Sequence, residues 1–152
     1  MANLKIVKFG DETLRKVCRP VDEITPKVIR LLDDMIETMR TANGCGLAAP
    51  QVGVLRRIAV VEVEEGVVYE LINPKIIAYS GEQKETEGCL SNPGKWGITK
   101  RPMSVTVRAM NRYGKEYEIN GKELLARALC HEIDHLNGKL YTDVQIKSVE
   151  ED

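Results

Sequence analysis

The sequence lacks a membrane-spanning segment, a secretory leader and an excess of positive charge. Apolar residues nowhere run together over the ~18 positions that a membrane helix needs. The first residues, MANLKIVKFGDETL, contain neither a long apolar run nor a small-residue cleavage site. The formal net charge of −1 removes the electrostatic argument for nucleic-acid binding. We therefore expect a cytoplasmic protein with no membrane association and no direct nucleic-acid substrate.

The sequence also has few cysteines, and their spacing is irregular. A chain of this length can bury a core without disulfide bonds, and a reducing compartment would keep its cysteines as thiols. They are therefore available as core residues, metal ligands or nucleophiles. The four cysteines are Cys18, Cys45, Cys89 and Cys130.

No internal repeat and no linker rich in Gly, Ser or Pro divides the sequence, which predicts a single domain over residues 1–152. Hydrophobic residues at 43% and charged residues at 30% are typical of globular proteins, and they exclude disordered and collagen-like chains.

An amphipathic helix is predicted near the N-terminus. Thr25 and Pro26 form a typical N-cap and first helical position, and apolar residues then recur at helical spacing up to Asn43-Gly44. This apolar stripe is best explained as a surface that faces the core.

The middle of the sequence predicts strands, because segments rich in β-branched residues alternate with turn formers. A second helix is predicted over residues 122–136, where strong helix formers precede Asn137-Gly138. Together these elements predict an α+β fold, with antiparallel sheets packed around the C-terminal helix. The predicted strands are 56–63, 67–74 and 75–80, followed by a hairpin of 103–111 and 116–119.

The strongest local signal is HEIDH (residues 131–135) in the predicted C-terminal helix. Residues four apart on a helix differ by about 40° around its axis, so His131 and His135 can bind one metal ion from one face. The HExxH pattern pairs two such histidines with a glutamate base, although so short a pattern also arises by chance on exposed helices. Apolar residues on more than one side of this helix predict that it is buried, and buried histidines need partners.

Helix geometry does not choose the base. Glu132 and Asp134 each lie about 80° from the direction midway between the two histidines. The extra methylene of glutamate reaches further, which favours Glu132 and leaves Asp134 as a supporting or surface group.

A third metal ligand is expected, because catalytic sites usually combine three protein ligands with one open position. Few residues follow His135, and Glu150 and Glu151 are expected to lie in a frayed tail. An upstream ligand is therefore expected, and Cys89 lies among turn formers that suit a thiolate on a loop. For the other three cysteines we expect small buried side chains.

Three segments resemble, in order, the signature motifs of the peptide deformylase family. They are GCGLAAPQ (44–51), EGCLS (87–91) and HEIDH (131–135), which match GxGLAAPQ, EGCLS and HExxH. The short separation between the first two resembles the bacterial type without an insertion. The resemblance implies a metal-dependent hydrolase that removes the N-formyl group from the formyl-methionine of new proteins and releases formate.

The resemblance also implies roles for individual residues. Cys89, His131 and His135 would bind the metal, and Glu132 would be the acid/base. Ferrous iron is the implied native metal, and the donor set also accepts zinc, nickel or cobalt. Gln51 and the backbone N–H of Leu90 would stabilise the oxyanion. Arg101 would support the site through polar contacts. The residues that would contact the substrate are Gly44, Gly46 and Leu47.

Three positions depart from the commoner forms of the family, and they bear on substrate side-chain preference and inhibitor sensitivity. Cys45 replaces a valine or isoleucine, Asn92 stands where an apolar residue is frequent, and Trp96 is the only tryptophan.

The expected partners are N-formylmethionyl nascent peptides. Because the end of the sequence, IKSVEED, is short and acidic, we expect only weak association with the ribosome.

Two other functions remain open on the sequence alone. A metallopeptidase that cuts internal peptide bonds would need a third ligand after the helix. A non-catalytic module with structural zinc would need a closed shell of four ligands, which requires Cys45 or Cys130 to join.

Overall fold

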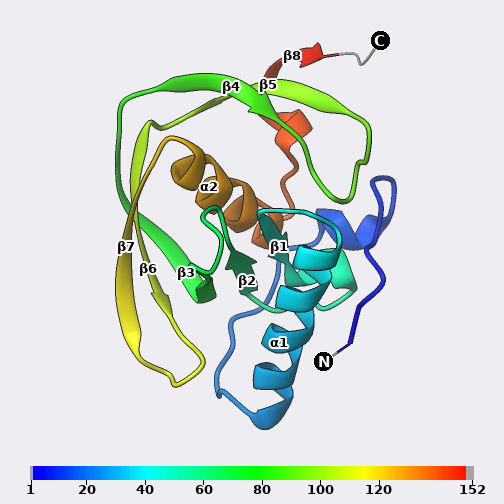
Figure 1. Ribbon diagram of the computed structural model, residues 1–152, viewed down its shortest axis with the longest axis vertical. Helices are drawn as coiled ribbons and strands as arrows, with labels where there is room; N and C mark the ends of the chain where they lie inside the picture. The colour runs from blue at the N-terminus through cyan, green and yellow to red at the C-terminus, as the bar shows by residue number, and fades with distance from the viewer. Residues whose placement is uncertain (1, 150–152) are drawn as a thin grey trace.

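The computed structural model describes residues 2–149, which form two α-helices and two antiparallel sheets (Figure 1). Every strand pairing is antiparallel, so the predicted α+β fold is confirmed. The larger sheet has the strand order β1 (Gly46–Ala48), β2 (Ile58–Val61), β3 (Tyr69–Ser80), β6 (Ser104–Met110) and β7 (Glu116–Lys122). The smaller sheet has the order β4 (Gln83–Glu87), β5 (Trp96–Arg101) and β8 (Gln145–Val149).

Helix α1 (Pro26–Thr41) confirms the predicted N-terminal amphipathic helix. The Thr25 side-chain oxygen accepts a hydrogen bond from the Val28 N–H at 3.3 Å, which satisfies one of the free donors at the start of the helix. The buried apolar residues of α1 are Leu32, Met35, Ile36 and Met39.

Strand β2 is buried on both faces, because the two helices cover opposite sides of the larger sheet. Ile58 and Val60 belong to the apolar cluster that includes α1, whereas Ala59 and Val61 belong to the cluster that includes α2 (Leu124–Leu136). Successive side chains of a strand point to opposite faces. The uninterrupted apolar sequence of β2 follows from this double coverage.

Helix α2 lies near the centre of the molecule, between strands of the two sheets (Figure 1). Nine of its 13 residues are buried, as the apolar flanks of HEIDH predict. The predicted start at residue 122 is wrong, because Lys122 still belongs to β7 and Glu123 adopts a φ of 54° that turns the chain into the helix. The Gln83 side-chain amide donates to the Glu123 carbonyl at 2.9 Å and holds this turn.

The strands predicted over residues 67–74 and 75–80 are in fact one strand, β3. Asn73 adopts a φ of 52°, and the register with β6 shifts there, so Asn73-Pro74 forms a bulge and not a turn. The Asn73 side chain bonds to the N–H and the carbonyl of Val21, both at 2.8 Å. The bulge is therefore stabilised by contacts with a distant segment.

The predicted hairpin is confirmed as β6 and β7, with Asn111 accepting hydrogen bonds within the turn. The short strands β1, β4, β5 and β8 were not predicted. The tail expected at Glu150 and Glu151 lies outside the described residues. Within residues 2–149, no helix has the length and apolar character needed to cross a membrane.

Candidate metal centre

Three side chains from two distant parts of the sequence converge beside α2. Cys89 follows the end of β4, whereas His131 and His135 lie one turn apart on α2. The Cys89 Sγ is 3.3 Å from the His135 Nε2, and the two histidine Nε2 atoms are 3.2 Å apart. All three donor atoms lie within 4.8 Å of one another. The structure thus brings together the three residues that the sequence predicts as metal ligands.

These donor atoms fit a divalent metal ion. Tetrahedral ligands with bonds of about 2.0 to 2.3 Å stand about 3.3 to 3.7 Å apart, close to the Sγ–Nε2 distance of 3.3 Å and the Nε2–Nε2 distance of 3.2 Å in the structure. Burial lowers the pKa of His135, and the neighbouring His131 lowers it further, so this imidazole stays neutral and can donate a lone pair. One thiolate with two imidazoles forms a three-ligand centre that leaves a position open for chemistry.

Glu87 fixes the orientation of His131. The His131 Nδ1 is 2.5 Å from the Glu87 Oε1, so the imidazole donates to the carboxylate and turns its Nε2 towards the other two ligands. Burial alone would raise the pKa of Glu87, but hydrogen bonds from His131 and Arg101 lower it to about 2. The carboxylate therefore remains charged at neutral pH and can serve as a permanent acceptor.

Arg101 connects Glu87 to α2. Its guanidinium contacts the Glu87 carboxylate at 2.7 and 3.2 Å and the Asp134 Oδ2 at 2.6 Å, and Thr99 donates to the same Glu87 carboxylate at 2.7 Å. Arg101 is therefore in polar contact with two residues next to the three donor side chains. The role of Glu87 as the hydrogen-bond acceptor for His131 was not predicted from the sequence. The available signal was that Glu87 is an acidic residue two positions before the cysteine ligand.

Glu132 and Asp134 differ sharply in their surroundings. Glu132 is buried and lines the same hollow as Cys89 and His131, and its Oε1 has no hydrogen-bond partner among the described residues. Burial raises the pKa of Glu132 to about 7. Asp134 is more exposed and is held by Arg101. The geometry therefore favours Glu132 as the group that exchanges protons in the hollow.

Gln51 has a fixed side-chain amide beside the ligands. Its Oε1 accepts from the Ala48 N–H at 2.9 Å, and its Nε2 donates to the Ser91 hydroxyl at 3.0 Å and contacts the Cys89 Sγ at 3.4 Å. This network sets the amide orientation, with the NH₂ group towards the donor atoms. Leu90, the other residue implied in oxyanion binding, lines the same hollow.

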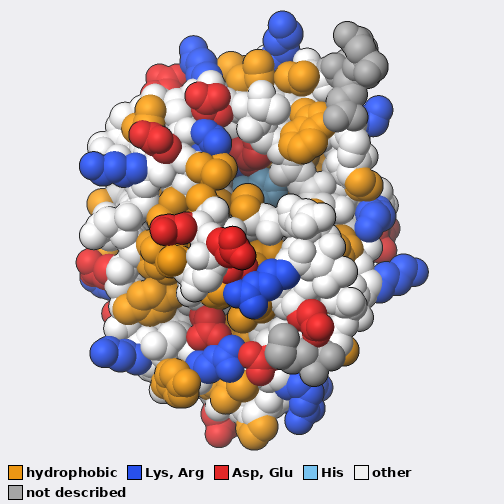
Figure 2. Space-filling view, in the orientation of Figure 1, with side chains coloured by type: hydrophobic (Ala, Val, Ile, Leu, Met, Phe, Trp, Pro, Cys, Tyr) orange, Lys and Arg blue, Asp and Glu red, His pale blue; other side chains and the backbone are white. Residues whose placement is uncertain are grey.

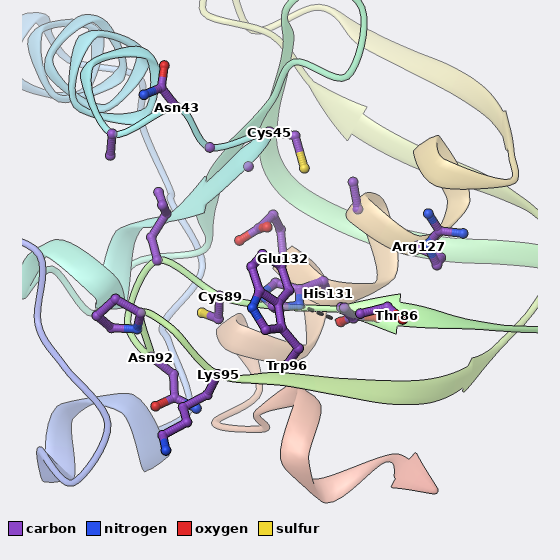
Figure 3. Close-up of a pocket in the computed structure, with 18 of the residues that line it drawn as sticks. Asn43, Cys45, Thr86, Cys89, Asn92, Lys95, Trp96, Arg127, His131 and Glu132 are labelled. Carbon is purple, nitrogen blue, oxygen red and sulfur yellow. Dashed lines mark hydrogen bonds and ion pairs between the residues drawn. The ribbon is translucent and has the colours of Figure 1, made fainter. Parts of the chain in front are cut away.

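A hollow of about 400 Å³ is lined by six of these residues, namely Gln51, Glu87, Cys89, Leu90, His131 and Glu132. Figure 2 shows a histidine side chain at its bottom, and Figure 3 shows Cys89, His131 and Glu132 grouped inside it. Exposed residues on two segments, 42–45 and 93–96, form part of its rim. The site is thus open to a ligand from solvent.

The segment leading into β1 forms one wall of the hollow. A Cβ atom at Gly44 would lie 2.6 Å from the Leu90 Cδ1, and one at Gly46 would overlap the Glu132 Oε2, so a larger residue at either position would displace one of these two side chains. Leu47 is different: its side chain is fully buried in the cluster that includes α1. Leu47 can therefore reach a substrate only through its backbone.

The prediction of buried side chains is right for Cys18 and Cys130 and wrong for Cys45. Cys45 is exposed on the rim of the hollow because the segment that carries it, residues 42–46, lines the hollow and belongs to neither apolar cluster. Among the residues that the structure describes, Cys89 is the only cysteine in the group that could bind a metal.

Comparisons with known proteins agree with this geometry. The family described as polypeptide deformylase matches residues 3–151. A peptide deformylase of Acetivibrio thermocellus is 58% identical over 152 residues, which cover 100% of this chain and 89% of that protein. The crystal structure of a peptide deformylase from Legionella pneumophila is similar with a TM-score of 0.92 and 44% identity, covering 94% of this chain and 86% of the other. The structure of an Ehrlichia chaffeensis peptide deformylase in complex with actinonin has a TM-score of 0.92 and 40% identity, covering 95% and 89% of the two chains.

Proposed function

Because this chain belongs to the polypeptide deformylase family and removes N-formyl groups from nascent peptides, we propose that Cys89, His131 and His135 hold its catalytic metal. The observation that carries the proposal is the convergence of these three donor atoms beside the buried Glu132, whose Oε1 has no hydrogen-bond partner among the described residues. A divalent cation bound there would polarise the formyl carbonyl and lower the pKa of water. The family match over residues 3–151 supports one catalytic domain over residues 1–152.

Glu132 is the proposed acid/base. It accepts a proton from the attacking water and delivers it to the amine that leaves when the formyl C–N bond breaks. The products are formate and a peptide with a free amino group. Its burial on the floor of the hollow keeps the carboxylate among the reacting groups, and the bare backbone of Gly46 leaves the space that it occupies.

Gln51 and the Leu90 backbone N–H are proposed to stabilise the oxyanion. Donors that are already oriented need no reorganisation during the reaction. The Gln51 amide meets this condition, because Ala48 and Ser91 hold it from both ends. Gly44, Gly46 and the Leu47 backbone would contact the peptide along the wall that leads to this site.

Replacing Gln51 with alanine should lower kcat by about 100- to 1000-fold, because one oriented donor to the oxyanion is lost. Steady-state assays with a formyl-methionyl peptide, together with metal analysis, measure this effect. Ser91→Ala is the matched comparison, since it keeps the Gln51 amide and removes only one of the two groups that hold it, so the loss should be smaller than that of Gln51→Ala. If Gln51→Ala kept near-wild-type turnover with a full complement of metal, the oxyanion role would be wrong.

Ferrous iron is proposed as the native metal. Metal analysis of protein purified without oxygen would identify it among the ions that this donor set accepts.

Action on nascent chains is consistent with a cytoplasmic location. Weak association with the ribosome stays a prediction that the described residues do not test.

Release of formate from a formyl-methionyl peptide tests the proposed function. We expect the loss of one formyl group by mass spectrometry and no cleavage of internal peptide bonds. Cleavage of an unformylated peptide at internal bonds would favour a metallopeptidase instead. Failure to hydrolyse either peptide would favour a structural metal module.

A further inference from the structure

The rim of the hollow contains one large aromatic side chain, Trp96. The floor consists of buried residues that include Gln51 and Glu132, whereas the segment 93–96 is exposed where the hollow opens to solvent. Figure 3 shows the Trp96 ring among the residues that line the hollow, together with Glu132 and His131. A peptide whose N-terminus reaches the floor must leave past this rim.

The Trp96 ring is held against the backbone beside the cysteine ligand. A Cβ atom at Gly88 would lie 2.6 Å from two atoms of the ring, so the indole contacts the glycine directly. Trp96 also begins β5 and pairs with Val149 in β8. Because both its side chain and its backbone are anchored, the 41% of the residue that remains exposed is a pre-positioned apolar surface.

Trp96 separates the metal hollow from a second depression. The second depression is lined by the same segment and by residues of η3 (Tyr141–Asp143) and β8, and four residues border both. Trp96 therefore lies in the segment that the two depressions share, on the exposed side of the metal hollow. The shared residues are Asn92, Gly94, Lys95 and Trp96.

We propose that Trp96 is a specificity-determining residue that favours a large apolar or aromatic side chain directly after formyl-methionine. This inference rests on the proposed function, which places the formyl group at the floor of the hollow. The hollow has the size of a small-ligand site, so formyl-methionine occupies it and the next residue lies at the rim. An aromatic side chain there gains contact with an indole surface that needs no ordering on binding.

Two peptides that differ only in the second residue, formyl-Met-Phe-Ser and formyl-Met-Gly-Ser, test the proposal. We expect Trp96→Ala to lower kcat/KM for the phenylalanine peptide by about 3- to 10-fold, mainly through KM. For the glycine peptide we expect less than about a 2-fold change, because glycine has no side chain to contact the ring. Trp96→Phe should restore part of the preference.

Tyr113→Ala is the matched control, since it removes an exposed aromatic ring from the turn between β6 and β7. Metal content and Tm are measured for every variant. An equal loss on both peptides would mean that Trp96 only supports the fold, and an unchanged preference would also overturn the proposal. If the wild-type protein released formate from neither peptide, the proposed function itself would fail.

Discussion

Replacing Glu132 with glutamine should lower kcat/KM for a formyl-methionyl peptide by about 100- to 10,000-fold. The amide has nearly the shape of the carboxylate but cannot accept a proton from water. Because the Glu132 Oε1 has no partner among the described residues, replacing this oxygen breaks no hydrogen bond among them. Metal content should therefore stay at the wild-type level, and formate release measures the loss.

Asp134→Asn is the control that separates the two acidic candidates of HEIDH. Asp134 contacts Arg101 at 2.6 Å, and Arg101 in turn holds the Glu87 carboxylate that orients His131. The expected effect is a weaker metal affinity with most of the activity restored by added metal. An activity loss as large as that of Glu132→Gln at full metal occupancy would assign the proton transfer to Asp134.

Much of the site could be predicted because its key residues follow local rules. The pairing of His131 with His135 is a consequence of helical periodicity alone, and α2 realises it with an Nε2 to Nε2 distance of 3.2 Å. A third ligand was predicted because two histidines are too few for a catalytic metal site. The resemblance to a family then identified this ligand as Cys89. Helix geometry alone left Glu132 and Asp134 nearly balanced, the longer side chain and the family resemblance favoured Glu132, and the tertiary surroundings now distinguish the two.

The remaining features depend on contacts between distant segments. Glu87 and His131 are 44 positions apart, and the sequence contains no local sign of that hydrogen bond. Asn73-Pro74 has the composition of a turn, yet Val21 stabilises it as a bulge within a strand. Glu123 adopts a left-handed φ that favours glycine, so the start of α2 could not be read from propensity.

The metal should contribute to stability as well as to activity. The three donor atoms are brought together within the fold, and without a cation two histidines of this group remain buried side by side. A ligand that binds only the folded state at 1,000 times its dissociation constant stabilises it by about 4 kcal/mol, which corresponds to about 10 °C in Tm for a domain of this size.

Removing the metal with a chelator should therefore abolish formate release and lower Tm by about 10 °C. Adding ferrous iron without oxygen should restore both, and calorimetry run in parallel with the assay measures them together. Cys89→Ala is the control, because a protein that has lost one of its three ligands should show little chelator-dependent shift. Since both readouts depend on the same three atoms, they should fall and recover together. A metal-free sample that stayed fully active would show that Cys89, His131 and His135 do not form the catalytic centre.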